Sequence, residues 1–261
     1  MNRSRIPSAR GAPAVPRALL LVLVLLIAAC PRAAMAFRPF DSTDAAVAAP
    51  REFEIEVGPL GYLAEDGSQS LVAPEIRLNW GFAPRSEIVL EGRNFVPRDR
   101  APGEPRDRIE ETGLSLKSIL RPGQLQGGSG PSVATEVGLL LPTLHGEPGA
   151  GASAAAIVSR RVRAATLHLN AVAELTRSHR PGLIGGAILE GPYAWRVRPA
   201  AEIEIQGERD GPTQRSALAG AIWAAREGLA FDLAYRIARE GERTTREVRA
   251  GLTWGFPLKR R

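Results

Sequence analysis

The last segment of the chain constrains its fold more than any other part of the sequence. Residues 246–256 read Arg-Glu-Val-Arg-Ala-Gly-Leu-Thr-Trp-Gly-Phe, with an apolar residue at every second position from Val248 onward. A period of two sends successive side chains to opposite faces of a β-strand. The segment therefore predicts a strand with one apolar face and one polar or small face.

An aromatic-rich strand ending in Phe near the C-terminus resembles the closing strand of bacterial outer-membrane β-barrels. Here Leu252, Trp254 and Phe256 would carry that role. The resemblance implies recognition of this strand by the barrel insertion machinery. Residues 257–261 depart from the pattern, because they continue beyond the Phe, and we expect them to form a C-terminal tail.

The N-terminal residues have the pattern of a secretory signal peptide. Arginines precede the apolar run ALLLVLVLLIAA, and Ala34-Met35-Ala36 forms an A-x-A cleavage site. The run is too short to cross a membrane as a helix, which takes about 20 residues. We expect residues 1–36 to be cleaved after Ala36; the alternative is lipoprotein processing at Cys30, where Ile27 to Cys30 resembles a lipobox.

Removing the leader changes the charge of the protein. The whole chain has 34 Lys and Arg, 28 Asp and Glu, and a net charge of +6. Residues 1–36 hold five Arg and no acid, so 34 minus five leaves 29 basic residues and a net charge of +1. The basic character belongs to the leader and predicts no nucleic-acid partner. Cys30 is the only cysteine, so the mature chain would have no thiol chemistry.

Beyond residue 50, short alternating segments are separated by clusters of Gly, Pro, Asp and Ser. This spacing is typical of an all-β sandwich or barrel. The segments are about ten residues long, the length of a tilted transmembrane strand, and the four Trp residues lie near segment ends, as an interfacial girdle requires. We predict an all-β fold: a single transmembrane, antiparallel up-and-down barrel of about 12 strands. It would span residues 51–256, after a periplasmic N-terminal segment at residues 37–50.

The lengths of the connections indicate which ends of the barrel face the periplasm and the exterior, and two features do not fit the simple pattern. The second, sixth, eighth and tenth connections are short, and the third, fifth, ninth and eleventh are long. This alternation predicts periplasmic turns at the even-numbered connections and extracellular loops at the odd-numbered ones. The fourth connection, residues 122–131, is longer than a periplasmic turn should be. Pro199 lies in mid-segment, where we expect it to require a bulge.

The polar faces of the segments define a predicted lumen. Two interpretations are open: paired charges could fill a narrow barrel, or rings of charge could line a water-filled path for a small polar or amphipathic solute. The candidate lumen-facing residues are Arg77, Asn79, Glu87, Glu91, Arg93, Lys117, Glu136, His168, Asn170, Glu174, Arg196, Arg198, Glu202, Glu204, Asp232, Arg236 and Arg249.

A family resemblance adds to this reading. The stretches FRPFDSTDAA from Phe37 and PEIRLNWGFAPRSEIVLEGR up to Arg93, with EVGLLLP and LHLNAVAEL further on, resemble outer-membrane transporters of the phenol-degradation meta-pathway type. The resemblance covers most of the chain after the leader. It implies a barrel for the passage of small molecules, hydrophobic ones among them.

Other functions have less support. A lipid-modifying outer-membrane hydrolase would need a nucleophile beside one of the histidines, His145, His168 or His179, and no serine motif marks one. There is no metal cluster, phosphate-binding loop or nucleotide motif, so we expect neither enzyme activity nor a cofactor. A surface-interaction barrel without an open channel would use the charged residues 97–110. The leading prediction is an outer-membrane channel, surrounded by lipid and passing a small solute.

Overall fold

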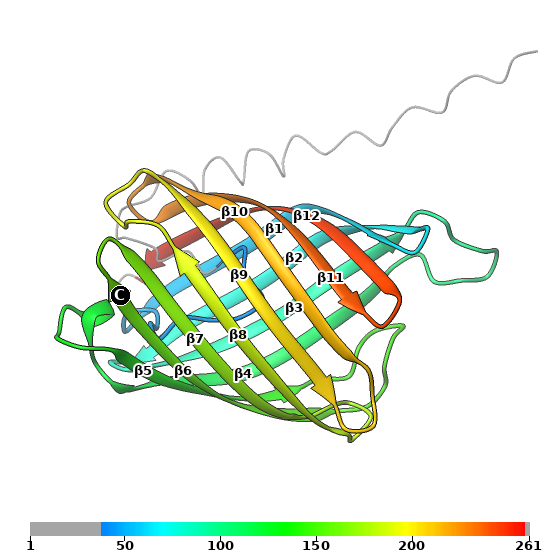
Figure 1. Cartoon of the computed structure of the whole chain (residues 1–261), viewed down its shortest axis with the longest axis horizontal. Helices are drawn as coiled ribbons and strands as arrows, with labels where there is room; N and C mark the ends of the chain where they lie inside the picture. Colours follow the sequence, from blue (N-terminus) through cyan, green and yellow to red (C-terminus); the bar gives the residue numbers. More distant parts are fainter. Residues whose placement is uncertain (1–37, 259–261) are drawn as a thin grey trace, which may run out of the picture. The chain divides into compact units, whose positions relative to one another are not determined.

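The computed structural model describes residues 38–258, which form one closed antiparallel barrel (Figure 1). The predicted signal peptide and the last residues of the predicted tail lie outside the described residues. The strands are β1 (Glu52–Glu65), β2 (Ser68–Ala83), β3 (Ser86–Pro97), β4 (Arg108–Arg121), β5 (Ser132–Leu140), β6 (Gly151–Val162), β7 (Ala165–Leu175), β8 (Pro181–Glu190), β9 (Val197–Glu208), β10 (Thr213–Arg226), β11 (Leu229–Glu240) and β12 (Arg243–Pro257).

The strand order confirms the predicted fold class. Each strand pairs with its neighbours in the chain, and β1 closes the barrel against β12, with Phe53 opposite Phe256. A sandwich would leave sheet edges, so that alternative is wrong. Within residues 38–258, no helix is long and apolar enough to cross a membrane.

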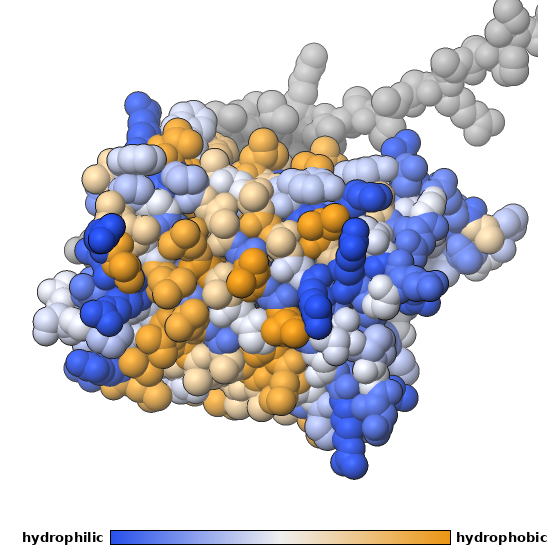
Figure 2. All heavy atoms as spheres, in the orientation of Figure 1, coloured by the Kyte–Doolittle hydropathy of each residue, from blue (hydrophilic) through white to orange (hydrophobic). Residues whose placement is uncertain are grey.

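The outer wall of the barrel is apolar. Leu183, Ile203 and Leu233 are each at least 60% exposed, although Ile203 and Leu233 lie in the middle of their strands. Figure 2 shows such side chains as a band between two more hydrophilic ends. Exposed apolar surface on this scale suits a hydrocarbon environment rather than water.

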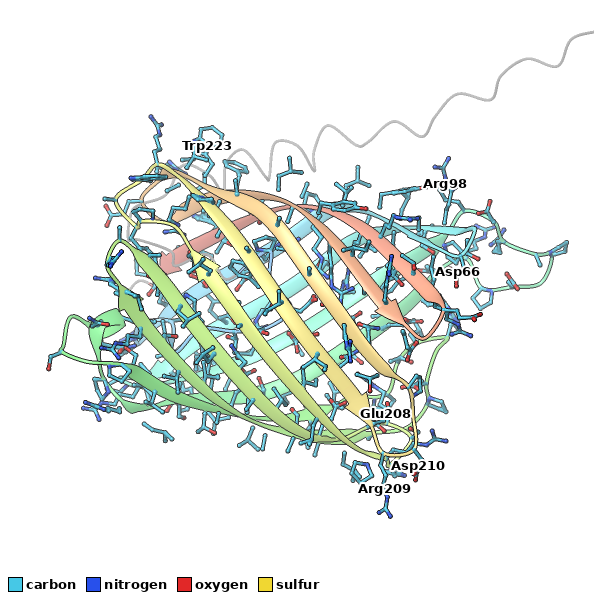
Figure 3. All side chains as sticks on the ribbon, in the orientation of Figure 1. Asp66, Arg98, Glu208, Arg209, Asp210 and Trp223 are labelled. Atoms are coloured by element: carbon cyan, nitrogen blue, oxygen red, sulfur yellow. The ribbon has the colours of Figure 1, made fainter. Side chains whose placement is uncertain are left out.

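The tryptophans gather at one end of the barrel. Trp80, Trp223 and Trp254 lie near strand ends, at the end of the barrel where β1 begins and β12 ends. Trp195 lies in a connection at the same end. The ring of Trp80 stacks on Phe53, and that of Trp223 stacks on Phe231. Figure 3 shows Trp223 at the end opposite to Asp66 and Arg98. The tryptophans therefore form a girdle at one end of the barrel only.

The predicted alternation of loop lengths is only partly right. As expected, residues 98–107 and 141–150 form long connections. They lie at the end of the barrel opposite to the one where β1 begins and β12 ends. However, the eleventh connection is only the turn Gly241–Glu242, and the eighth spans residues 191–196. The ladder of β11 and β12 continues through the polar residues that the sequence pattern had given to a loop, with Glu240 opposite Arg243.

Pro199 needs no bulge, contrary to expectation. Neither ladder of β9 shows a register shift there. The Pro199 carbonyl accepts a hydrogen bond from Gly191 N–H, just beyond the end of β8. In an antiparallel ladder the nitrogen and carbonyl of one residue face the same neighbouring strand, so the Pro199 nitrogen also faces the β8 side. Because the β8–β9 ladder ends at Glu190 and Ala200, the missing N–H of Pro199 costs no ladder hydrogen bond. Staggered strand ends thus give a closed barrel a place for proline.

Candidate functional site: a lumen filled by the N-terminal segment

The segment before β1 lies inside the barrel. We call residues 38–48 the plug segment; Figure 1 shows the start of the described chain, in blue, within the barrel. Its hydrogen bonds and ion pairs reach nine strands through Glu56, Glu75, Glu87, Lys117, Ser159, Asn170, Glu202, Asp232, Arg236 and Arg249. From the sequence we expect a periplasmic segment at residues 37–50, whereas residues 38–48 make their contacts within the barrel.

Backbone N–H groups of the plug segment donate to side chains of the wall. Glu202 accepts from the N–H groups of Asp41 and Ser42 at 2.8 and 2.7 Å. Asn170 accepts from Thr43 N–H at 3.2 Å and donates its amide to the Thr43 carbonyl at 2.7 Å. The plug segment belongs to no strand. It is therefore held by side chains, which can exchange partners without breaking the barrel's ladder.

Ion pairs hold the plug segment at mid-lumen. Asp41 lies between two guanidinium groups, with Arg249 Nη2 2.7 Å from its Oδ1 and Arg236 on its other oxygen. Asp41 is outside the spanning strands; burial would raise the pKa of its carboxyl, but Arg249 and Arg236 outweigh burial and lower the pKa to about 2. The Asp41 carboxylate is therefore ionised at neutral pH.

A second charged group sits deeper along the plug segment. Arg38 lies 2.7 Å from Glu75 and 3.5 Å from Asp232, on strands from opposite sides of the β1–β12 junction. Two wall glycines leave room for its guanidinium: a side-chain carbon added at Gly58 or Gly251 would collide with it. Glycine is thus used here for close approach rather than for an unusual backbone angle.

An apolar contact complements the charges. Phe40 of the plug segment belongs to a buried cluster with Ile188, Leu218, Ile222 and Ala234, which come from β8, β10 and β11. The lumen is therefore filled on this side by hydrocarbon, not lined by water-accessible polar groups alone. Phe40 acts as an anchor, because its withdrawal would expose this cluster.

The long fourth connection contacts the plug segment. It contains a short 3₁₀ turn at Gln124–Gln126, and Gln126 Nε2 donates to the Ala45 carbonyl at 2.8 Å. Leu125 packs on the buried Ala45, Ala134 and Ile157. The extra length that did not fit a periplasmic turn covers the plug segment where it leaves the barrel.

The structure places the sequence-predicted lumen residues as follows. All except Arg196 lie on inward-facing positions of their strands. Arg77 lies 3.0 Å from Glu91 and 3.7 Å from Glu136. Arg93 pairs with Glu247, and Arg198 lies 3.4 Å from Glu190.

Arg196 corrects the set. It precedes β9, is exposed in the 191–196 connection, and its guanidinium is 3.4 Å from the Ala225 carbonyl. The alternation with Trp195 had suggested a strand position, but β9 begins at Val197.

Several inward carboxylates were missing from the candidate set although the alternation marks them. Glu54 and Glu56 flank outward Ile55, and Glu247 precedes outward Val248. On the inward strand positions carboxylates outnumber bases. The carboxylates include Glu54, Glu56, Glu75, Glu87, Glu91, Glu136, Glu174, Glu190, Glu202, Glu204, Asp232 and Glu247. The bases include Arg77, Arg93, Lys117, Arg198, Arg236 and Arg249. The wall is thus acidic, although the chain after the leader is nearly neutral.

A serine lies beside a lumen histidine, which the sequence did not indicate. Ser159 Oγ is 2.8 Å from His168 Nδ1, and His168 Nε2 is 3.3 Å from Glu190. The order Ser–His–Glu matches that of a hydrolytic triad. However, Ser159 and His168 are 0% exposed, and Ser159 Oγ also accepts from Ala45 N–H at 2.9 Å. The arrangement holds the plug segment and leaves no room for a substrate carbonyl.

Replacing this serine tests its structural role. Ser159→Ala should lower the free energy of unfolding by about 1–3 kcal/mol, because Ala45 N–H and His168 Nδ1 lose a buried partner. Ser153→Ala, on the same strand and face, should change it by less than about 0.5 kcal/mol. Urea unfolding followed by tryptophan fluorescence measures both. Ester hydrolysis by the parent chain that is abolished in Ser159→Ala would contradict the structural assignment.

No group of three or more His, Cys, Asp or Glu within residues 38–258 has the arrangement of a metal site. Glu91 pairs with Arg77, Glu56 accepts from the Asn79 amide, and Glu202 accepts from plug N–H groups.

Comparisons with known proteins identify the fold. No family model and no curated protein matches the sequence. Among solved structures, the COG4313 outer membrane channel from Pseudomonas putida F1 is similar, with a TM-score of 0.61 and 12% identity over 84% of this chain and 100% of that one. The KdgM porin has a TM-score of 0.54 and 9% identity over 78% and 99%. The NanC porin has a TM-score of 0.53 and 6% identity over 77% and 98%. The chain therefore shares the barrel fold of these channel proteins.

Proposed function

We propose that the protein is an outer-membrane channel for small solutes, closed in this structure by its own plug segment. The observation that carries the proposal is an inner wall rich in charged side chains inside a barrel whose outer wall is apolar. A fully structural barrel could fill its lumen with strand side chains alone. Here a separate, non-strand segment fills it through contacts that are mostly side-chain mediated, and such a segment can leave without disrupting the wall.

The acidic wall suggests the class of solute. Once the plug segment leaves, Glu202, Asn170 and Glu87 lose the N–H groups that now satisfy them. Rings of Asp and Glu favour cations in pores, because their field concentrates positive ions in a low-dielectric wall. Because inward carboxylates outnumber inward bases, the open lumen would favour cationic or neutral solutes over anions.

The finer family assignment is also part of this proposal. The resemblance to transporters of the phenol-degradation meta-pathway type fits the shared barrel fold, as do the channels named above. It adds neutral aromatic molecules to the solutes worth testing. The apolar cluster around Phe40 would give such molecules a contact that a purely polar lumen lacks. We propose no enzymatic activity.

Two measurements test the proposal. The refolded protein should migrate differently on gels before and after boiling, and fractionation should recover it with the outer membrane. In planar bilayers under a KCl gradient, openings should show a reversal potential of the sign for cation preference. Recovery in the soluble periplasmic fraction, or a preference for chloride, would contradict the respective part of the proposal.

A further inference from the structure

Two arginines face each other on the outer wall. Arg215 of β10 is directly opposite Arg239 of β11 in the ladder, and both are exposed. Their outward direction follows from the outward neighbours Ala217 and Ile237, which are paired in the same ladder. Like charges directly across an antiparallel pair destabilise a sheet. The pair therefore lacks a structural reason within the barrel itself.

A third arginine extends the group. Arg246 of β12 is exposed and lies opposite Ile237, two residues before Arg239. Arg239 is therefore directly opposite Arg215 and diagonal to Arg246. Across residues 38–258, none of these three arginines has an ion pair with a carboxylate, whereas Arg209 nearby pairs with Asp210 at 3.7 Å. The only acidic residue in the adjoining β11–β12 turn is Glu242, which is exposed.

The outer surface is hollowed at this point. A depression of about 590 Å³ is lined by Thr213, Arg215, Ser216, Ala217, Ile237, Arg239 and Gly241. Its basic side chains come from the start of β10 and the end of β11, at the same end of the barrel as the long connections 98–107 and 141–150. Its apolar side chains, Ala217 and Ile237, continue towards the exposed Tyr235 and Leu233. Charge at the rim and hydrocarbon below it match the two halves of a lipid.

We infer that Arg215, Arg239 and Arg246 form a binding site for the phosphorylated headgroup of a lipid in the surrounding leaflet. This inference rests on the membrane embedding proposed above, but not on solute passage. Arginine forms paired hydrogen bonds with phosphate oxygens, and a shared anion converts the repulsion of the opposed pair into attraction. The acyl chains would lie over Ala217, Ile237 and Leu233.

The chemistry favours a doubly phosphorylated headgroup of the lipid A type. A single phosphodiester carries one negative charge and would leave a group of three arginines undersaturated. Two phosphate monoesters on one headgroup supply enough charge and acceptors for all three. The position agrees with the outer leaflet, because the long connections 98–107 and 141–150 lie at the same end of the barrel.

The test measures the midpoint of heat-induced mobility loss on gels for the full mature chain in neutral detergent. Bisphosphorylated lipid A should raise the midpoint of the parent chain, and phosphatidylglycerol at equal phosphate should raise it much less. In Arg215→Gln/Arg239→Gln, the apparent Kd for lipid A should increase about tenfold, as expected for losing charge-assisted bonds. Without lipid, the same variant should melt at or above the parent midpoint, because the repulsion is gone.

A matched control uses two exposed arginines at the opposite end of the barrel. Arg160 and Arg226 also lack ion pairs among the described residues, so Arg160→Gln/Arg226→Gln removes the same charge. An equal loss of lipid A stabilisation in this control would overturn the site. An equal shift by phosphatidylglycerol would overturn the assignment to lipid A. The channel proposal is judged separately by conductance, and a chain that is not heat-modifiable in detergent would overturn the membrane embedding on which both depend.

Discussion

A mature chain that begins at residue 49 should conduct ions in planar bilayers under conditions where the full mature chain is closed. The truncation removes Asp41 and Asp44, which pair with Arg249, Arg236 and Lys117, and it removes the Phe40 anchor. Water then replaces the plug segment as the partner of the wall charges. We expect resolved single-channel steps, together with a lower melting midpoint.

A point substitution should have the same effect in weaker form. An added side-chain carbon at Gly186, on the inner face of β8, would collide with Ser42, whereas one at the adjacent Gly185 meets only Ile205 at 3.7 Å. Gly186→Val should therefore increase the open probability by displacing the plug segment, and Gly185→Val should leave it unchanged. Conductance recordings of both variants, at equal amounts of folded protein, separate the two outcomes.

The truncation also decides between a channel and a structural barrel. A folded, heat-modifiable chain from residue 49 that shows no conductance would retire the channel proposal. The charged inner wall would then belong to a filled core that serves stability alone. If the truncated chain does not fold, Gly186→Val still tests the channel proposal, because that variant retains every plug residue.

Leu233→Arg should destabilise the barrel by about 2–4 kcal/mol, the cost of an arginine near the bilayer midplane. Leu233 is 60% exposed and lies between Phe231 and Tyr235 on the apolar band. Unfolding in urea from phospholipid vesicles measures the change. The large effect is specific to a membrane, since a residue this exposed to water would tolerate arginine.

Leu120 supplies the control. It is 63% exposed, comparable to Leu233, but it is the penultimate residue of β4, at the end that carries the tryptophans. Leu120→Arg should cost only about 0–1 kcal/mol, because its guanidinium can reach the interface. Equal costs at the two positions would mean that the apolar band does not lie in a bilayer. Ala234, on the inward face of the same strand, is unsuitable as a control, because it is 4% exposed and packs in the Phe40 cluster.

The strands were predictable because each has one face in a uniform environment. Leu229 to Ile237 alternate with Ala230, Asp232 and Arg236, and that period alone gives the strand, its phase and its outward side. Strand ends were less predictable, since Thr244 and Thr245 pair in the ladder beyond the apolar band, where no hydrophobic period marks them.

The plug segment was not predictable from local pattern. Residues 38–48 have no period of two or 3.6, and their partners lie as far as 210 residues away, as in Arg249 to the Pro39 carbonyl. The surplus of inward carboxylates was the available signal. Glu54, Glu56 and Glu202 on inward faces require donors that the wall bases are too few to supply. That demand indicates an internal partner but does not say which segment provides it.

Arg38 has a mechanical consequence for the barrel. Its guanidinium bridges Glu75 on β2 and Asp232 on β11, so it spans the inner side of the two strands, β1 and β12, that join the ends of the chain. That junction is the one place where the wall is closed by pairing between the first and the last strand, and thus where it could part sideways. Arg38 therefore cross-links the strands on both sides of this junction through its two ion pairs. Withdrawing the plug segment from the lumen would remove this cross-link. Opening of the lumen along the barrel axis would then also weaken the β1–β12 junction towards the lipid.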